Sequence, residues 1–327
     1  MRARLATKRH VSDEDSPDTT PKGAPDVHGV KNRRSSRSSE IAKSHPALGI
    51  QAVPYLFLSL LTHARNRATE EELNARFGSD AGTPDDGRAK LRKLERRFEG
   101  HFPIEKDLSY LDLGCGSGDL SMALAERGVA QVTGIDFIPR NIERAKARAA
   151  MSGVAERVSF VCRDLREWVP EKKFDVLLSI DVLEHIDNPG AFLKKIADFV
   201  SYEGVAVLAF GPLFHSPFGD HMWDFFRVQI PWRGLLFSES LILRLRRECF
   251  RPTDPAMRYR DIVGGLNLMR YSEFLQHVAA AGWHFDYLAM NTFLPKIVRP
   301  LSDALTRYPF LGNYFAHNVY AILRRNR

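Results

Sequence analysis

Short apolar segments alternate with helical segments from residue 108 onward, and this alternation constrains the fold more than any other feature of the sequence. The predicted strands cover residues 108–113, 131–136, 158–162, 174–180 and 205–210. The predicted helices between them cover residues 120–127, 141–151 and 191–200. Strands joined by helices of about 10–15 residues form parallel βαβ units. We therefore expect an α/β fold with a doubly wound parallel sheet that is buried on both faces.

The pattern lapses after residue 210 and resumes near the end of the chain. Residues 211 to about 260 are rich in aromatic side chains and look irregular. A loop of this length is uncommon in a compact domain unless it has a function, so we expect this insertion to cap a binding pocket. A second small hydrophobic cluster is the alternative. A helix at 271–281 and strands at 283–290 and 318–323 are expected at the far edge of the sheet.

Two segments precede the alternating pattern. Residues 1–45 contain many Ser, Pro, Asp, Lys and Arg residues and almost no large apolar side chains, so we expect a disordered tail. Residues 46–107 have a helical pattern in which Leu91, Leu94 and Phe98 form an apolar stripe. We expect this helical segment to pack on the sheet and to act as a lid over a ligand; the two roles are compatible.

The net charge of +7 does not favour a nucleic acid as the partner, because most of it lies in the tail. Residues 1–45 hold ten Lys and Arg residues against six Asp and Glu residues, and the remaining +3 is ordinary for a folded domain. The three cysteines have no metal-binding spacing. The sequence lacks the ~20-residue apolar segment of a membrane span. It also lacks a signal-peptide or transit-peptide pattern, so we expect a cytoplasmic protein.

A glycine-rich turn follows the first predicted strand, with the sequence Asp112-Leu113-Gly114-Cys115-Gly116-Ser117-Gly118. Glycines let the backbone turn tightly and approach a ligand closely, since no Cβ stands in the way. In an open α/β sheet such a turn lies at the carboxyl ends of the strands, where ligands bind. The candidate cofactor-binding residues of this turn are Asp112, Gly114, Cys115, Gly116 and Gly118.

Acidic side chains end the next three strands. Asp136 ends the second strand and is placed to accept hydrogen bonds from both hydroxyls of an adenosine ribose. Asp164 follows the third strand, in position for an adenine amino group. Ile180 and Asp181 end the fourth strand at the switch in strand order, beside the reactive end of a ligand. One such Asp is often only a helix cap, but four elements at successive strand ends together indicate an adenosine-containing ligand.

The glycine spacing distinguishes S-adenosylmethionine (SAM) from a dinucleotide. The dinucleotide fingerprint is Gly-x-Gly-x-x-Gly, whereas here Gly118 comes one position early and Asp119 stands at the place of the third glycine. Asp112, two residues before the first glycine, is also foreign to that fingerprint. An acid at this place gives the charged amino-acid end of SAM a partner, so SAM is the expected cofactor.

These motifs resemble those of class I SAM-dependent methyltransferases. The similarity rests on residues 111–118, 134–137, 163–165 and 174–189, and residues 181–189 (DVLEHIDNP) are particularly similar to ubiquinone-biosynthesis O-methyltransferases. The resemblance is strong over about 108–210 and implies a seven-stranded Rossmann-like sheet with helices on both faces. Its implied cofactor contacts are Asp112, Gly114 and Gly116 for the methionine part, Asp136 for the ribose, Asp164 and Leu165 for the adenine, and Ile180 for the sulfonium. Phe137, next to Asp136, is a further candidate cofactor-binding residue.

Two absent motifs narrow the expected methyl acceptor. No Asn/Asp-Pro-Pro-aromatic element follows the fourth strand, as in enzymes that methylate amino groups of bases, and no cysteine follows a proline, as in pyrimidine-C5 enzymes. We therefore expect transfer to an O or N atom of a small molecule, sugar or lipid-like acceptor. An RNA or protein methyltransferase and a non-catalytic SAM-binding protein stay open as alternatives.

Three histidines are candidate general bases for an acceptor hydroxyl. His185 lies just past the fourth strand, near the expected methyl group, although packing at a helix entry is an equal alternative. His215 and His221 lie in the insertion and would face the acceptor if that segment caps the pocket.

Two weaker patterns have alternatives of their own. Asp181, Glu184 and His185 resemble the set with which quinone O-methyltransferases hold a divalent metal, and helix capping is the alternative. Residues 241–247 are apolar and then basic, which suits contact with an anionic membrane. Ordinary helix packing with exposed arginines is the favoured interpretation of that segment.

Overall fold

The fold follows from how the alternating segments bury their apolar sides. The computed structural model describes residues 52–62, 84–222, 225–251, 255–262, 265–292 and 299–326. The predicted tail, residues 1–45, lies outside the described residues, as does much of the predicted helical segment 46–107. The described residues from Val53 onward belong to one compact unit.

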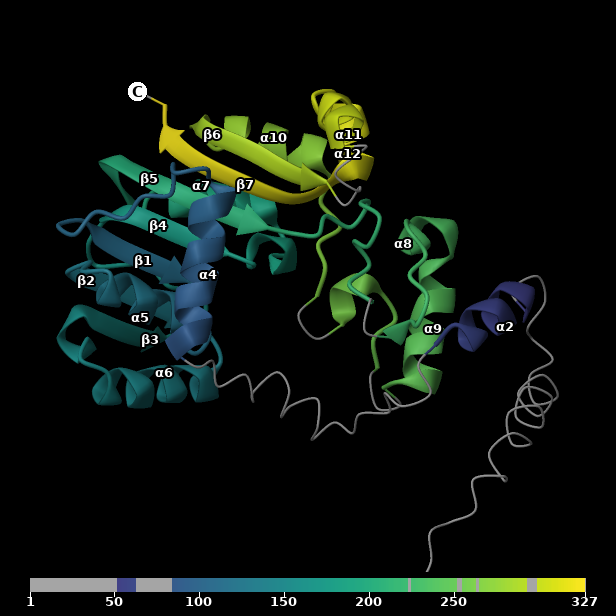
Figure 1. The fold of residues 1–327 in the computed structure, drawn as a ribbon, viewed down its shortest axis with the longest axis horizontal. Coiled ribbons are helices and arrows are strands. Elements are labelled where there is room, and N and C mark those ends of the chain that lie inside the picture. Colours follow the sequence, from purple (N-terminus) through teal and green to yellow (C-terminus); the bar gives the residue numbers. More distant parts are fainter. Residues whose placement is uncertain are drawn as a thin grey trace, which may run out of the picture. The chain divides into compact units, whose positions relative to one another are not determined.

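Seven strands form one sheet in the order β3-β2-β1-β4-β5-β7-β6 (Figure 1). The strands are β1 (Ser109–Leu113), β2 (Gln131–Asp136), β3 (Val158–Cys162), β4 (Phe174–Ile180), β5 (Val200–Phe210), β6 (Trp283–Thr292) and β7 (Ala316–Arg325). Strands β1 to β5 pair in parallel, whereas β7 is antiparallel to both β5 and β6. The expected α/β class and seven-stranded sheet are confirmed.

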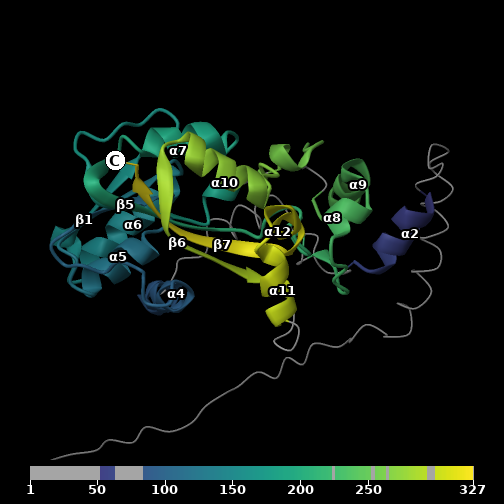
Figure 2. The same cartoon turned by 90° about the horizontal axis from the view of Figure 1, so that it is seen from above.

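Helices cover both faces of the sheet (Figures 1 and 2). On one face lie α4 (Pro84–Arg97), α5 (Asp119–Glu126) and α6 (Pro139–Met151); on the other lie α7 (Pro189–Ile196) and α10 (Tyr271–Ala280). The two-residue period of β5 shows why both faces are covered. Ala206, Leu208 and Phe210 pack with the α7 and α10 side, and the residues between them pack with the α4 and α5 side. Every residue of β5 from Val205 to Phe210 is therefore buried.

The predicted apolar stripe before the sheet is the buried face of α4. Leu91, Leu94 and Phe98 are all buried against the sheet and α5. Residues on the adjoining face of α4 line a cavity (described below), so the helix both packs on the sheet and borders a pocket.

Most predicted element boundaries lie within two residues of the observed ones, but the end of the helix predicted at 191–200 and the start of the strand predicted at 205–210 are wrong. The strands predicted at 131–136, 158–162 and 174–180 have those bounds. The helix predicted at 191–200 begins earlier and ends at Ile196, because Val200 already pairs with Phe174 as the first residue of β5.

The insertion after β5 is more regular than its composition predicts. It contains α8 (Arg233–Leu236) and α9 (Glu239–Cys249), the latter capped by the Ser238 side chain. The apolar residues of the segment 241–247 are buried in α9, in agreement with ordinary helix packing. The expected exposure of its arginines is wrong, because Arg246 is buried and Arg244 and Arg247 are half-buried.

The insertion also has a small core of its own. The guanidinium of Arg233 is buried, donates two hydrogen bonds of 2.7 and 3.0 Å to the Asp220 carboxylate and lies 3.8 Å from the centre of the Phe226 ring. A buried pair of this kind needs both partners, because either charge alone would be left unsolvated.

The described residues also contain the α-helices α2 (Ala52–Leu60), α11 (Arg299–Thr306) and α12 (Pro309–Phe315) and three short 3-10 helices at Ala155–Arg157, Leu183–His185 and Tyr259–Asp261. No helix in the described ranges has the length and apolar character needed to cross a bilayer.

Candidate active site

The glycine-rich turn joins β1 to α5 at the carboxyl end of the sheet. Gly114, Gly116 and Gly118 all have positive φ angles, of 68°, 55° and 78°. A Cβ on Gly114 would lie 2.5 Å from a methyl group of Val182, and one on Gly118 would lie 2.6 Å from the Phe160 ring. The turn therefore requires glycine at these two positions for backbone conformation and for space.

Asp112 lies buried beneath this turn. Its side chain accepts a hydrogen bond of 2.6 Å from the Ser121 hydroxyl, and its exposed fraction is 3%. Burial raises the pKa of Asp112 to about 6, and the Ser121 hydrogen bond and the charge of Lys90 oppose this rise. Within the described part of the chain Asp112 forms no salt bridge, although the Lys90 charge favours its ionised form.

Asp136 connects the end of β2 to the glycine-rich turn. One carboxylate oxygen accepts a hydrogen bond of 3.0 Å from the Gly116 amide, and the other accepts one of 2.8 Å from the Ile138 amide. Its side chain is nearly buried, while the neighbouring Phe137 is 67% exposed. Asp136 therefore fixes the conformation of the glycine-rich turn, and its contact with a ribose stays a prediction.

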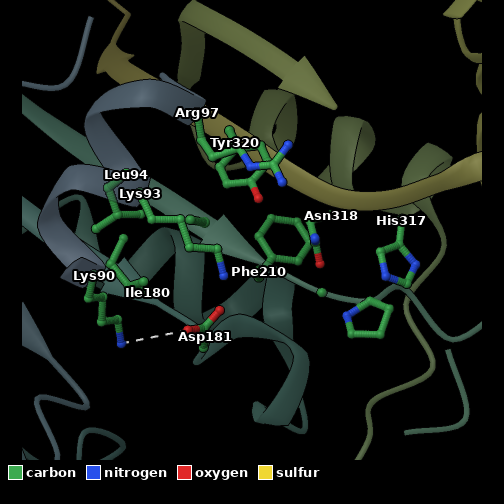
Figure 3. Close-up of a pocket in the computed structure, with 13 residues that line it drawn as sticks. Lys90, Lys93, Leu94, Arg97, Ile180, Asp181, Phe210, His317, Asn318 and Tyr320 are labelled. Carbon is green, nitrogen blue, oxygen red and sulfur yellow. Dashed lines mark ion pairs between the residues drawn. The ribbon is translucent and has the colours of Figure 1, made fainter. Parts of the chain in front are cut away.

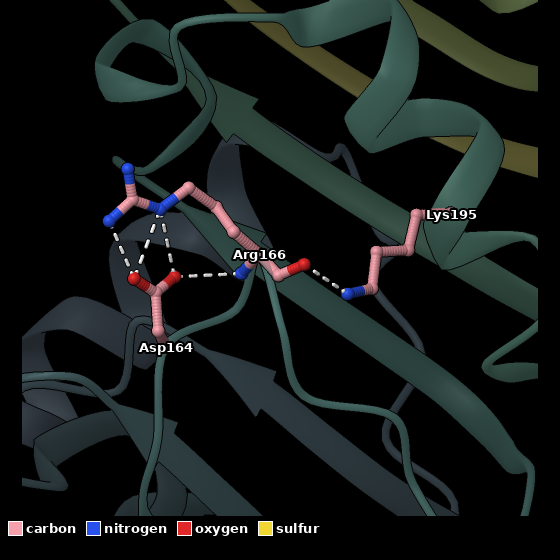
Figure 4. A network of polar contacts seen from close by, with 3 residues as sticks. All are labelled: Asp164, Arg166 and Lys195. Atoms are coloured by element: carbon pink, nitrogen blue, oxygen red, sulfur yellow. Dashed lines mark hydrogen bonds and ion pairs between the residues drawn. The ribbon is translucent and has the colours of Figure 1, made fainter.

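Asp164 is engaged by a neighbour that the sequence motif does not indicate. Arg166 donates three side-chain hydrogen bonds and one backbone hydrogen bond to the Asp164 carboxylate (Figure 4). The backbone carbonyl of Arg166 accepts a hydrogen bond from the Lys195 ammonium. The Arg166 side chain holds the pKa of Asp164 below its usual value. Leu165, between them, packs its side chain against the core.

A cavity of about 210 Å³ opens at the glycine-rich turn. Five of the ten predicted cofactor-binding residues line it, namely Asp112, Gly114, Cys115, Gly116 and Ile180. Its further lining residues are Lys90, Ser117, Asp119, Leu120 and Asn141. Gly118, Asp136, Phe137, Asp164 and Leu165 are not in its lining, and their predicted cofactor contacts stay predictions.

A second cavity of about 250 Å³ lies between α4, the ends of β4 and β5, and the start of β7 (Figure 3). It is lined by Lys90, Lys93, Leu94, Arg97, Ile180, Asp181, Ala209, Phe210, Gly211, Pro212, His317, Asn318 and Tyr320. The two cavities share Lys90 and Ile180. They therefore meet at the end of β4, which is the place where the strand-end motifs predict the reactive end of the cofactor.

None of the three predicted histidine bases is in the lining of either cavity. One ring nitrogen of His185 lies 2.7 Å from the Gly265 carbonyl oxygen. His221 places a ring nitrogen 2.9 Å from the carbonyl oxygen of Pro212, so it supports the cavity wall from behind. Burial lowers the pKa values of His215 and His221.

His317 is the histidine that lines the second cavity (Figure 3). One ring nitrogen lies 3.3 Å from the Ser216 hydroxyl, and burial lowers the pKa of the imidazole to about 4. The sequence pattern did not indicate it, since it lies in β7, more than one hundred residues beyond the recognised motifs. Pairing of β7 with β5 brings it next to the end of β5, where the Leu213 amide donates to its carbonyl oxygen.

The three residues of the possible metal set point to different partners. Asp181 lies 3.6 Å from the Lys90 ammonium, and Glu184 is buried and accepts a hydrogen bond of 3.1 Å from the Gly211 amide. His185 is held by Gly265. Among the residues described, no group of three or more His, Cys, Asp or Glu side chains is arranged to hold a metal ion.

Comparison with known proteins places residues 104–210 in a family. This segment matches the family model of the methyltransferase domain. The mitochondrial ubiquinone biosynthesis O-methyltransferase of Arabidopsis thaliana is 37% identical over 103 residues, which are 31% of this chain and 32% of that protein. The ubiquinone biosynthesis O-methyltransferase of Neisseria meningitidis serogroup C is 37% identical over 111 residues, 33% of this chain and 45% of that protein. The chain thus spans less than half the length of these two curated relatives.

Similarity to solved structures is weaker. Coclaurine N-methyltransferase bound to N-methylheliamine and SAH has a TM-score of 0.48 and 15% identity, covering 90% of this chain and 93% of that chain. A likeness at this level has no bearing on the activity.

Over residues 104–210 the chain is similar to the methyltransferase domain, and the sheet order and the glycine-rich turn support a class I SAM-dependent methyltransferase fold for this segment. Over about a third of its length the chain is similar to ubiquinone biosynthesis O-methyltransferases.

Proposed function

We propose that this protein binds SAM in the first cavity and transfers its methyl group to an O or N atom of a small molecule, sugar or lipid-like acceptor in the second. The observation that carries the proposal is that the two cavities meet at Ile180 and Lys90. A methyl group placed at the end of β4 would face the second cavity directly, and alignment of the two reactants is the main requirement for an in-line transfer.

The residues of the first cavity fit SAM. Gly116 offers an open position where no atom lies within 4 Å of a Cβ site, and the buried Asp112 carboxylate suits the ammonium of the amino-acid part. Asp136 stands at the end of β2, the place of a ribose-binding acid in this fold. When bound, SAM supplies a methyl group already activated by its sulfonium.

The chain's own residues then position the acceptor and take up its proton. Burial keeps the His317 imidazole neutral at physiological pH, since its pKa is lowered to about 4. A neutral imidazole in the cavity wall has a lone pair that can accept the proton of an acceptor hydroxyl as the oxygen–carbon bond forms and the sulfur–carbon bond breaks, and its lowered pKa makes it a weaker base than an ordinary histidine. We therefore propose His317 as the base, in preference to His185, His215 and His221.

A second cavity of about 250 Å³ suits part of a small molecule, which favours this proposal over an RNA or protein acceptor. For a macromolecular acceptor, deletion of residues 1–45 with its excess of positive charge would lower the rate. A non-catalytic SAM-binding protein would bind the cofactor and release no S-adenosylhomocysteine (SAH) with any acceptor.

Calorimetric titration of the purified protein with SAM and with NAD tests the cofactor assignment. We expect micromolar binding of SAM and none of NAD. Asp136→Asn should weaken SAM binding at least about tenfold, which is 1.4 kcal/mol, while Glu143→Gln on the exposed face of α6 should bind normally. Binding of NAD in place of SAM would replace this proposal with a dehydrogenase.

Screening of acceptors for SAH release tests the reaction. Hydroxyl- and amine-bearing sugars, phenols and lipid head groups form the panel, and release of SAH that depends on the acceptor is the expected result. SAM binding with no acceptor-dependent release across the panel and with RNA and protein extracts would favour the non-catalytic alternative.

A further inference from the structure

Helix α4 presents three cationic side chains to the second cavity (Figure 3). Lys90, Lys93 and Arg97 follow the spacing i, i+3 and i+7, which places them on one side of the helix. Asp181 is the one carboxylate among the described lining residues, and it lies 3.6 Å from Lys90. Lys93 and Arg97 therefore give this part of the cavity wall a positive charge that no lining acid balances.

A solvated basic helix face is the ordinary explanation for such residues, and it suffices for part of α4. Arg92 and Arg96 are exposed and line neither cavity. Arg97 differs from them, because it is half-buried and its guanidinium lies 5.9 Å from the centre of the Tyr320 ring. Within the part of the chain that the structure describes, Lys93 and Arg97 have no carboxylate at ion-pair distance.

The opposite wall adds neutral polar groups from β7. Asn318 and Tyr320 line the same cavity, facing the α4 side chains (Figure 3). An arginine fork, an ammonium and neutral hydrogen-bond donors together form the kind of set that binds phosphate or carboxylate oxygens.

We propose that the methyl acceptor carries an oxyanion, phosphate or carboxylate, which binds between Lys93 and Arg97. The position of the accepting atom rests on the function proposed above, which places the methyl group near Ile180 and Lys90. Arg97 lies seven residues beyond Lys90, or roughly 10 Å along the helix axis at 1.5 Å per residue. The anion is therefore about one sugar or aromatic ring away from the methylated atom.

Binding of inorganic phosphate, and separately of acetate, tests the site without knowledge of the acceptor. Calorimetric titrations at low ionic strength compare the wild-type protein with the double variant Lys93→Gln/Arg97→Gln. The matched control is Arg92→Gln/Arg96→Gln, which removes the same charge from the same helix outside the cavity. We expect at least about tenfold weaker binding in the first variant and less than about twofold in the control. The probe that binds the wild-type protein with the lower dissociation constant shows whether the site prefers phosphate or carboxylate.

Equal weakening in both double variants would overturn the proposal, as would failure of the wild-type protein to bind either probe at millimolar concentration. Thermal melting confirms that each variant is folded, and Lys93→Gln alone, at an exposed side chain, provides a milder variant. SAM titrations run in parallel separate the two proposals. If the wild-type protein does not bind SAM, the proposed function is contradicted. The phosphate and acetate titrations test the oxyanion site independently of that result.

Discussion

The Lys90 ammonium lies 3.6 Å from the Asp181 carboxylate, where the first cavity meets the second. Both side chains are well exposed, at 40% and 64%, so the pair contributes less than about 1 kcal/mol to stability. Its importance is electrostatic, because it sets the charge beside the place where a sulfonium would lie. Asp181 holds this position through a left-handed backbone conformation, with φ of 59°, at the end of β4.

Asp181→Asn should weaken binding of SAM more than binding of SAH. The substitution leaves the Lys90 charge unbalanced, and that charge repels the sulfonium of SAM but not the neutral sulfur of SAH. We expect the ratio of the two dissociation constants to shift about threefold or more, measured by calorimetry. Asp187→Asn, at an exposed position outside both cavities, is the control, and an unchanged ratio in Asp181→Asn would show that the sulfonium lies elsewhere.

Asp112→Asn should raise the melting temperature of the SAM-free protein at pH 8. Burial raises the pKa of Asp112 to about 6, above the value expected in the unfolded chain. The folded state therefore holds the proton more tightly, so this contribution to stability is present at low pH and is lost as the pH rises through about 6. The neutral Asn avoids that loss, and its advantage in thermal melting should shrink at pH 5.

The same substitution should have the opposite effect on the cofactor. Ionised Asp112 is the proposed partner of the SAM ammonium, so wild-type affinity should rise between pH 5 and pH 7 as the carboxyl loses its proton. Asp112→Asn should bind SAM at least about tenfold more weakly at pH 7.5 and without this pH dependence. If Asp112→Asn binds SAM as tightly as the wild-type protein, Asp112 does not contact the cofactor. Glu143→Gln is the control variant.

Gly114→Ala should destabilise the protein and abolish SAM binding. The residue has a φ of 68°, and its new Cβ would lie 2.5 Å from a Val182 methyl group. Backbone strain of this kind costs about 1–3 kcal/mol. Gly153→Ala is the matched control, since no atom lies within 4 Å of its Cβ position, and urea unfolding should separate the two variants clearly.

His317→Gln should lower kcat on the acceptor found by screening while leaving SAM affinity intact. Loss of a general base typically costs 10²–10⁴-fold in rate. Because the pKa of His317 is lowered to about 4, the wild-type rate should show no bend near pH 6.5 that arises from this group. His284→Gln, at an exposed position of β6, is the control. A larger loss in His221→Gln or His185→Gln would return the role of base to one of the histidines indicated by the sequence.

Local patterns were sufficient for most elements of the sheet and for half of the residues predicted to bind the cofactor. Strands 131–136 and 174–180 were predicted with their observed bounds, and most of their residues are buried. The glycine-rich turn and Asp112 were predicted from a short contiguous motif. The positive φ angles of the turn favour glycine, and Asp112 lies two residues before the first of these glycines. Within the aromatic insertion, packing of residues 241–247 as a helix was predicted and is observed in α9, whereas α8 was not predicted.

By itself the sequence determined the α/β class, the strand-end acids and the resemblance to methyltransferases, because each rests on patterns of residues close in the chain. The tertiary structure alone decided the second cavity. There, antiparallel pairing of β5 with β7 places Phe210 opposite Val319 and so brings His317 and Asn318 beside Gly211. Packing of α4 on the sheet then turns Lys93 and Arg97 toward them. Such a cavity is formed by segments some two hundred residues apart, and no local pattern records which side chains long-range pairing brings together.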